Sequence, residues 1–165
     1  MKNLYQYFSL FLISLCLLPI SANASDKQAF STDSYYREII RTVAEVDFKA
    51  MAAAYHPDAV LVTEKKSIPI KEVMKRWKKE GEKFQSEGGT ASVSFRFFDR
   101  KLSETTAFET GIFRYSSIDK DGVVKTIYSH FQDLNVKKNG RWLTLMERQQ
   151  NLSSEVEWNT LPDWN

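Results

Sequence analysis

The sequence predicts a single α+β domain in which two helices precede an antiparallel sheet. Apolar residues recur at helical spacing in two segments, and apolar and polar residues alternate in the segments that follow. These two periodicities distinguish amphipathic helices from half-buried strands. Two turn dipeptides, Asp121-Gly122 and Asn139-Gly140, separate the alternating segments. We therefore expect the order helix, short strand, helix and a meander of about four long strands.

The first helix is expected over residues 34–55, with Thr32, Asp33 or Ser34 as its N-cap. Its apolar stripe comprises Tyr36, Ile39, Ile40, Val43, Val46, Ala50, Met51, Ala54 and Tyr55. We expect Asp47 to interrupt this helix and to cap a second half. His56-Pro57 should end it, because proline disfavours the helical conformation of the preceding residue. A short β-branched strand over residues 59–63 follows.

The second helix is expected over residues 70–84. Its apolar stripe comprises Ile70, Val73, Met74, Trp77 and Phe84, and lysines and acids fill the opposite side. Gly88-Gly89 then breaks the helical pattern. Alternation predicts strands over residues 91–97, 105–117 and 123–136, and the last of these leads into a hairpin.

The hairpin over residues 126–151 turns at Asn139-Gly140, the dipeptide most typical of a two-residue turn. In that register Val136 lies opposite Leu143, Leu134 opposite Leu145, Gln132 opposite Glu147, and His130 opposite Gln149. One face is then apolar near the turn and polar far from it, as in a partly open pocket. The polar part comprises Tyr128, His130, Gln132, Glu147 and Gln149.

A three-residue loop is the alternative, with Gly140 in the left-handed conformation. It would shift the partner strand by one residue and place Trp142, Thr144, Met146 and Arg148 beside His130. We prefer the two-residue turn because it places Leu134, Val136, Leu143 and Leu145 on one face.

The N-terminal residues indicate a cleaved secretory signal over residues 1–24. Lys2 precedes an apolar run over residues 7–20, and Ala22-Asn23-Ala24 satisfies the small-x-small cleavage rule. We expect an exported protein, periplasmic or secreted, with a loose segment over residues 25–33, a domain over 34–151 and a tail over 152–165. The later sequence contains no run of the roughly 20 apolar residues that an integral membrane segment needs.

Composition excludes several function classes. Removal of the signal would leave 22 basic and 21 acidic residues, a net charge of +1 that gives no steering toward nucleic acid. It would also remove Cys16, the only cysteine, and with it thiolate catalysis and cysteine metal sites. His130 and Glu147 give only two ligands where zinc needs three or four, so we expect no metal and no cofactor.

Three features together resemble the nuclear-transport-factor-2-like superfamily. They are a long N-terminal helix that exits through YHPDAV, a second helix with a tryptophan, and a meander that closes on NGRW. The resemblance covers nearly all of residues 34–150 and is closest to the SnoaL-like and ketosteroid-isomerase-like groups. It implies a cone-shaped, cystatin-like fold, in which a strongly curved antiparallel sheet wraps both helices around an apolar cavity. It also implies a homodimer that forms through the outer sheet face.

The superfamily includes isomerases, dehydratases, hydrolases, binders and assembly domains, so the fold does not select a function. Ketosteroid isomerase uses a carboxylate base with a tyrosine and a protonated aspartic acid as donors. The resemblance implies Tyr55 or Tyr128 as the donor and Glu147 as a carboxylate. The sequence offers no clear match for that enzyme's aspartate base.

The candidate catalytic residues are His130 and Glu147, since imidazole and a desolvated carboxyl suit proton transfer. The candidate ligand-binding residues are Tyr55, Trp77, Tyr128, Gln132 and Gln149. The alternative for each is ordinary core packing, or for Glu147 an ion pair with Arg114 or Arg148.

We expect a binder of a small, mostly apolar ligand. A cofactor-independent isomerase, dehydratase or hydrolase that uses His130 and Glu147 is the first alternative. An assembly module that uses Phe131, Trp142 and Met146 on the outer face is the second.

Overall fold

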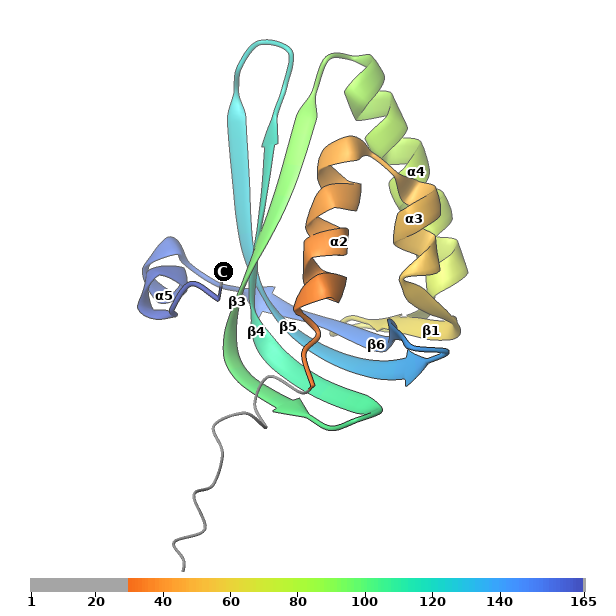
Figure 1. The fold of residues 1–165 in the computed structure, drawn as a ribbon. Coiled ribbons are helices and arrows are strands. Elements are labelled where there is room, and N and C mark those ends of the chain that lie inside the picture. The colour runs from red at the N-terminus through yellow and green to blue at the C-terminus, as the bar shows by residue number, and fades with distance from the viewer. Residues whose placement is uncertain (1–29, 165) are drawn as a thin grey trace, which may run out of the picture.

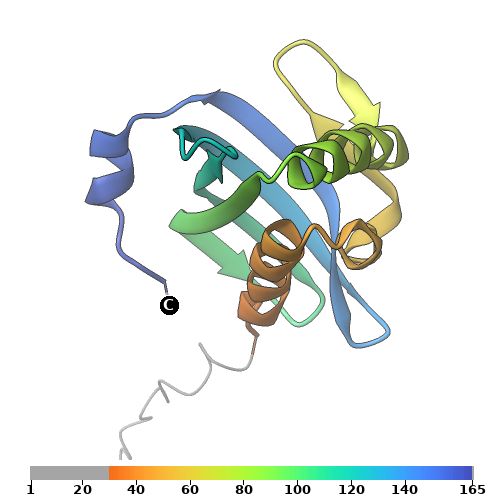
Figure 2. The ribbon, with the colours of Figure 1, turned by 90° about the horizontal axis from the view of Figure 1, so that it is seen from above.

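The computed structural model describes residues 30–164 and contains one curved, six-stranded sheet with helices on its concave face (Figures 1 and 2). The helices of the concave face are α2 (Asp33–Glu45), α3 (Phe48–Ala53) and α4 (Ile70–Ser86), and α5 (Glu155–Thr160) lies on the outer face (Figure 1). The strands are β1 (Tyr55–Val62), β2 (Ser67–Pro69), β3 (Thr90–Leu102), β4 (Thr106–Ile118), β5 (Val124–Lys138) and β6 (Arg141–Leu152). Their order in the sheet is β2-β1-β6-β5-β4-β3, and only β1 and β6 pair in parallel.

The predicted α+β order is therefore confirmed. The expected signal over residues 1–24 lies outside the described residues. No helix within residues 30–164 combines the length and the apolar character that crossing a membrane requires.

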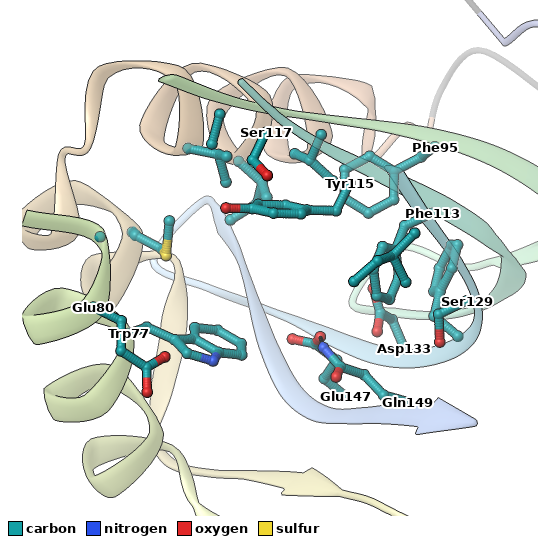
Figure 3. A pocket seen from close by; sticks show the side chains of 18 of the residues that line it. Trp77, Glu80, Phe95, Phe113, Tyr115, Ser117, Ser129, Asp133, Glu147 and Gln149 are labelled. Atoms are coloured by element: carbon teal, nitrogen blue, oxygen red, sulfur yellow. Dashed lines mark hydrogen bonds between the residues drawn. The ribbon is translucent and has the colours of Figure 1, made fainter. Parts of the chain in front are cut away.

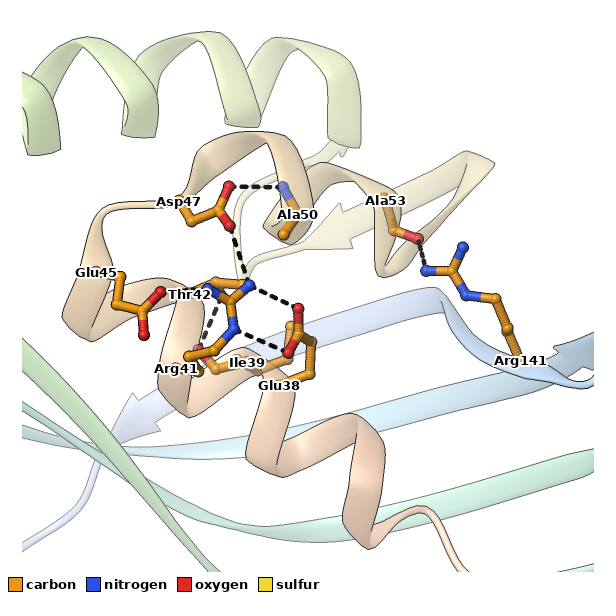
Figure 4. Close-up of polar contacts among 9 residues, drawn as sticks. All are labelled: Glu38, Ile39, Arg41, Thr42, Glu45, Asp47, Ala50, Ala53 and Arg141. Carbon is orange, nitrogen blue, oxygen red and sulfur yellow. Dashed lines mark hydrogen bonds and ion pairs between the residues drawn. The ribbon is translucent and has the colours of Figure 1, made fainter.

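The break between α2 and α3 lies where the sequence predicts it. Val46 adopts a left-handed φ of 57°, and the Asp47 side chain caps α3 by accepting a hydrogen bond from the Ala50 amide at 3.0 Å. Arg41 donates to Glu38 and to Asp47, which ties the two helices together (Figure 4). The helix nevertheless ends earlier than expected, at Ala53, because His56-Pro57-Asp58 already belongs to β1.

Helix α2 anchors the core through Tyr36, whose side chain is fully buried. Its ring centroid lies 4.9 Å from those of both Phe95 and Phe97 on β3. Burying an aromatic side chain of this size removes more apolar surface from water than most core residues do. This contact fixes the N-terminal half of α2 against the far edge of the sheet, while α3 and α4 cover the other edge (Figure 2).

The sheet bends where strand registers shift. Between Phe97 and Asp99, β3 has one residue more than β4, which is a β-bulge. Gly111 lies opposite Phe97, and a Cβ at that position would lie 2.1 Å from the Arg96 carbonyl oxygen. Only glycine fits this close approach of the two backbones.

The β5–β6 hairpin explains the largest error in the sequence prediction. The two-residue turn is confirmed, since Asn139 and Gly140 have φ values of 52° and 76° and Val136 lies opposite Leu143. A register shift between Asn135 and Leu134 then leaves Leu145 as an extra residue on β6. The expected pairs Leu134–Leu145, Gln132–Glu147 and His130–Gln149 are therefore wrong. Beyond the bulge the observed pairs are Leu134–Met146, Asp133–Glu147, Gln132–Arg148 and Phe131–Gln149.

The C-terminal tail crosses the outer sheet face, opposite the other helices (Figures 1 and 2). Its buried Trp158 packs under the guanidinium groups of Arg96 and Arg114, which lie 4.7 and 5.3 Å from the ring. Such stacking stabilises both partners. The chain then returns to the core, where the Trp164 ring lies 5.7 Å from that of Phe97. The sequence pattern predicts neither α5 nor this return.

Candidate functional site

A cavity of about 1060 Å³ lies between the helices and the concave sheet face. Helices α2, α3 and α4 form one side, and strands β3 to β6 form the other. Most of its wall is aromatic or aliphatic, and the volume suits a drug-sized molecule. Figure 3 shows the Trp77 indole from α4 directed toward Glu147 and Gln149 of β6, while Tyr115 from β4 lines another part of the cavity.

Two of the carboxyl groups on the cavity wall are neighbours, Asp133 on β5 and Glu147 on β6 (Figure 3). They are direct partners across the ladder. The Asp133 side chain is nearly buried, with Oδ2 accepting a hydrogen bond from the Tyr36 hydroxyl at 3.1 Å. Its Oδ1 has no hydrogen-bond partner among the described residues. Glu147 accepts from the Tyr55 hydroxyl at 2.5 Å and from Gln149 Nε2 at 2.8 Å.

Tyr36 connects this pair to a second network centred on the fully buried Glu109. Its hydroxyl lies 3.2 Å from Glu109 Oε2, and Glu109 forms an ion pair with Arg100 at 2.8 Å. Thr32 and Asn135 also donate to Glu109, at 2.6 and 3.0 Å. A hydroxyl has a single proton, so Tyr36 cannot fully satisfy both Glu109 and Asp133. If Tyr36 donates to Glu109, its hydrogen bond with Asp133 requires a proton on the aspartic acid.

Burial raises the pKa of both members of the Asp133–Glu147 pair. Burial and the neighbouring Glu147 raise the pKa of Asp133 well above the usual range. The hydrogen bond from Tyr36 lowers this pKa, but it offsets only part of the rise. Burial also raises the pKa of Glu147, while hydrogen bonds from Tyr55 and Gln149 oppose the shift. Burial likewise raises the pKa of Tyr36 and Tyr55, so their hydroxyls remain donors. Two adjacent acids in different environments are suited to different protonation states.

Four residues expected at the site lie on the cavity wall: Tyr55, Trp77, Glu147 and Gln149. Tyr55 begins β1 immediately after the α3 cap, which directs its hydroxyl toward β6. The indole of Trp77 faces the sheet from α4 (Figure 3). Their roles in binding stay predictions.

The placement expected for Tyr128, His130 and Gln132 is wrong, because all three point to the outer face. His130 Nε2 lies 2.9 Å from Glu157 of α5, and its ring stacks on that of Phe98. The Tyr128 ring packs 5.9 Å from that of Trp158, and Gln132 accepts a hydrogen bond from Arg148.

The outer-face set expected for an assembly module is also largely wrong. Phe131 is buried in the core, and Trp142 packs against that core. Only Met146 of this set lies on the outer face, where it is paired with Leu134 across the β5–β6 ladder.

Asp133 is the residue that sequence reasoning missed. Alternation divides β5 into two faces, and the set Ser129, Phe131, Asp133 and Asn135 is the buried one. The sequence pattern assigns the interior to the set with Leu134 and Val136, because apolar faces usually form the core. The available signal was Phe131, which shares a strand face with Asp133, but alternation alone cannot tell which of the two faces is inside.

No three His, Asp or Glu side chains within residues 30–164 come together as metal ligands would.

Comparison with known proteins identifies structural relatives only. No protein-family model and no curated protein sequence matches this chain. An NTF-2 like protein of unknown function from Shewanella oneidensis MR-1 superposes with a TM-score of 0.60 at 18% identity, over 76% of this chain and 99% of that chain. A ketosteroid isomerase-like protein from Erwinia carotovora atroseptica gives a TM-score of 0.52 at 16% identity, over 74% and 94%. An NTF2-like superfamily protein from Salmonella enterica gives 0.58 at 7% identity, over 74% and 89%.

At these identities the likeness shows the fold. The resemblance seen in the sequence is thereby confirmed at that level. With α2, α3 and α4 on the concave face of a curved six-stranded sheet, the chain has the nuclear-transport-factor-2-like α+β cone fold.

Proposed function

We propose that this protein binds a small, mostly apolar molecule in the cone cavity, with Asp133 and Glu147 binding its polar group. The observation that carries the proposal is the unpartnered Asp133 Oδ1, nearly buried on the wall of a 1060 Å³ cavity. A buried polar atom without a partner costs about 1–3 kcal/mol. A ligand that donates a hydrogen bond to Oδ1 recovers that free energy. The proposal includes export of the chain after loss of residues 1–24.

A thermal-shift screen tests the binding proposal. The protein purified from cells that express the full chain is screened against lipophilic compounds of one to four rings, beside Asp133→Asn and Glu147→Gln. A compound at about 100 times its dissociation constant should stabilise the fold by roughly 2.7 kcal/mol. The expected result is a set of hits that weaken in both variants and persist in Glu157→Gln, whose carboxyl lies on the outer face. Hits that bind all variants equally would contradict the assigned role of the two acids.

A cofactor-independent isomerase, dehydratase or hydrolase is the second candidate. The observation that favours it is the contact of each acid with its own tyrosine. Asp133, whose pKa is raised well above the usual range, suits the proton donor, and Glu147, which accepts hydrogen bonds from Tyr55 and Gln149, suits the proton acceptor. His130 has no part in this catalytic mechanism, because its side chain lies on the outer face. An enzyme should convert a screening hit with a pH-rate profile that is abolished in Glu147→Gln. A binder should show affinity and no turnover in either protein.

We also propose a homodimer that uses the part of the outer face left open by the tail. The support is an apolar patch near the β5–β6 turn, formed by Phe108, Leu134, Val136, Leu143 and Met146. A charge at its centre would oppose association. Light scattering should report a dimer for the wild type and a monomer for Leu134→Glu. A monomeric wild type would refute the dimer and leave the cavity proposal intact.

A further inference from the structure

The cavity wall is rich in hydrogen-bond acceptors and poor in cations. Asp133 Oδ1 has no partner, and both oxygens of Glu147 serve as acceptors. Glu64 and Glu80 add two more carboxyls at exposed positions of the lining, against Lys65 as the one basic side chain among the lining residues. A ligand that complements the acceptor atoms and the carboxyl groups of this wall donates hydrogen bonds and carries a positive charge.

The remainder of the wall favours the same kind of ligand. Trp77, Phe84, Phe95, Phe113, Tyr115 and Phe131 line the same cavity as the carboxyl pair. Ring faces attract cations, most strongly where water is excluded, and they also bury an apolar body. A neutral hydroxyl could satisfy Asp133 Oδ1, but only a cation would let both acids of the pair ionise.

We propose that the ligand is an organic amine whose protonated nitrogen lies between Asp133 and Glu147 and whose apolar body packs against the aromatic wall around Trp77. This inference rests on the proposed function and specifies its ligand class. The unpartnered, nearly buried Oδ1 of Asp133 is the atom that points to a donor. The opposing Glu147 supplies the second acceptor.

Amine binding should release a proton. In the ligand-free protein, burial and the neighbouring acid keep the pKa of Asp133 raised. The groups that face Asp133 are Tyr35 and Tyr36 from α2, Tyr55 from β1, Glu109 from β4 and Glu147 from β6, with Arg100 from β3 committed to Glu109. None of these provides a free cation at the pair. An ammonium between the two acids lowers their pKa values, so a proton held by the pair leaves as the amine enters.

Matched probes separate an amine from a neutral ligand. Calorimetry at pH 7 compares arylalkylamines of one to four rings with the alcohols of the same carbon skeletons, each in phosphate and in Tris buffer. We expect at least one amine to bind tenfold or more tightly than its alcohol. The binding heat should differ between buffers with the sign of proton release. Amine affinity should rise from pH 5 to pH 8 while the amine remains protonated.

Variants assign the effect to the pair. Asp133→Asn and Glu147→Gln should each lower amine affinity at least tenfold while changing alcohol affinity little, and Glu157→Gln should leave both unchanged. Circular dichroism checks that each variant is folded. Alcohols that bind as tightly as amines, or proton uptake on binding, would overturn the amine assignment and leave the cavity function standing. Failure of both series to bind the folded wild type would reject the proposed function itself.

Discussion

Asp133 and Glu147 lie opposite each other across the β5–β6 ladder, and each accepts a hydrogen bond from a tyrosine of a different element. Tyr36 comes from α2 and Tyr55 from β1, so the helices and the sheet both position the pair. Side chains held from two elements are better fixed than side chains held from one loop. The pair therefore depends on the packing of α2 against the sheet, and this dependence can be tested by substitution.

Asp133→Asn should change the pH dependence of stability. The pKa of Asp133 is raised in the folded protein, so the folded state holds the proton more tightly than the unfolded chain. That contribution is complete below the unfolded-state pKa of about 3.9 and is lost as pH rises through the folded-state pKa. The variant lacks this loss, so its free energy of unfolding relative to wild type should increase from pH 4 to pH 8. Urea unfolding at several pH values measures it, with Asp58→Asn, whose side chain is 86% exposed, as the control. A difference that does not vary with pH would contradict the expected titration of Asp133.

Arg100→Met should destabilise the protein severely. Glu109 is fully buried, and Arg100 is its cationic partner. Removal of one member of a buried ion pair leaves an uncompensated charge and costs about 3–5 kcal/mol. Denaturant unfolding should show this loss, and adding Glu109→Gln should recover part of it because the orphaned charge disappears. Arg41→Met is the matched control, since its partners Glu38 and Asp47 lie near the surface and its effect should be much smaller. Equal losses for the two arginine variants would refute the role of burial.

Gly111→Ala should be poorly tolerated. The added Cβ would lie 2.1 Å from the Arg96 carbonyl oxygen and 2.9 Å from the Phe131 ring, so strands β3 and β4 would have to separate. Overpacking of this kind typically costs about 1–3 kcal/mol. Gly122→Ala is the control, because its Cβ would meet no atom within 4 Å and only its φ of +80° opposes the change. The comparison of urea midpoints separates collision from backbone preference, and a Gly111→Ala midpoint above that of Gly122→Ala would exclude the close approach.

The order of helices and strands was predictable because it depends on local periodicity. The stripe through Ile70, Val73 and Met74 and the turn at Asn139-Gly140 specify their elements without reference to distant residues. The capping role of Asp47 was equally predictable from the sequence, since an N-cap needs only a suitable side chain three residues before the amide that it accepts from.

The lining of the cavity was less predictable because it depends on one irregularity. The bulge at Leu145 changes which residues of β6 face β5, and no local pattern indicates a bulge there. The face with Leu134 and Val136 looked like the core, yet it is the outer side. The strand prediction therefore located Glu147 and Gln149 but exchanged Asp133 for His130. The ion pair of Arg100 with Glu109 joins two strands across a hairpin and a bulge, and it too needed the structure.

His130→Ala tests the corrected position of the histidine. His130 contacts Glu157, and Glu157 also accepts from the Ser153 hydroxyl at 2.7 Å, so these residues hold α5 on the outer face. Loss of the imidazole should weaken this attachment while leaving the cavity wall unchanged. Hydrogen exchange should therefore become faster over residues 153–160, and Glu157→Gln should give a similar increase. Binding of any cavity ligand should remain at the wild-type level in His130→Ala and decrease in Asp133→Asn. The reverse pattern, with lost affinity and an unchanged tail in His130→Ala, would restore the histidine to the site that the sequence first suggested.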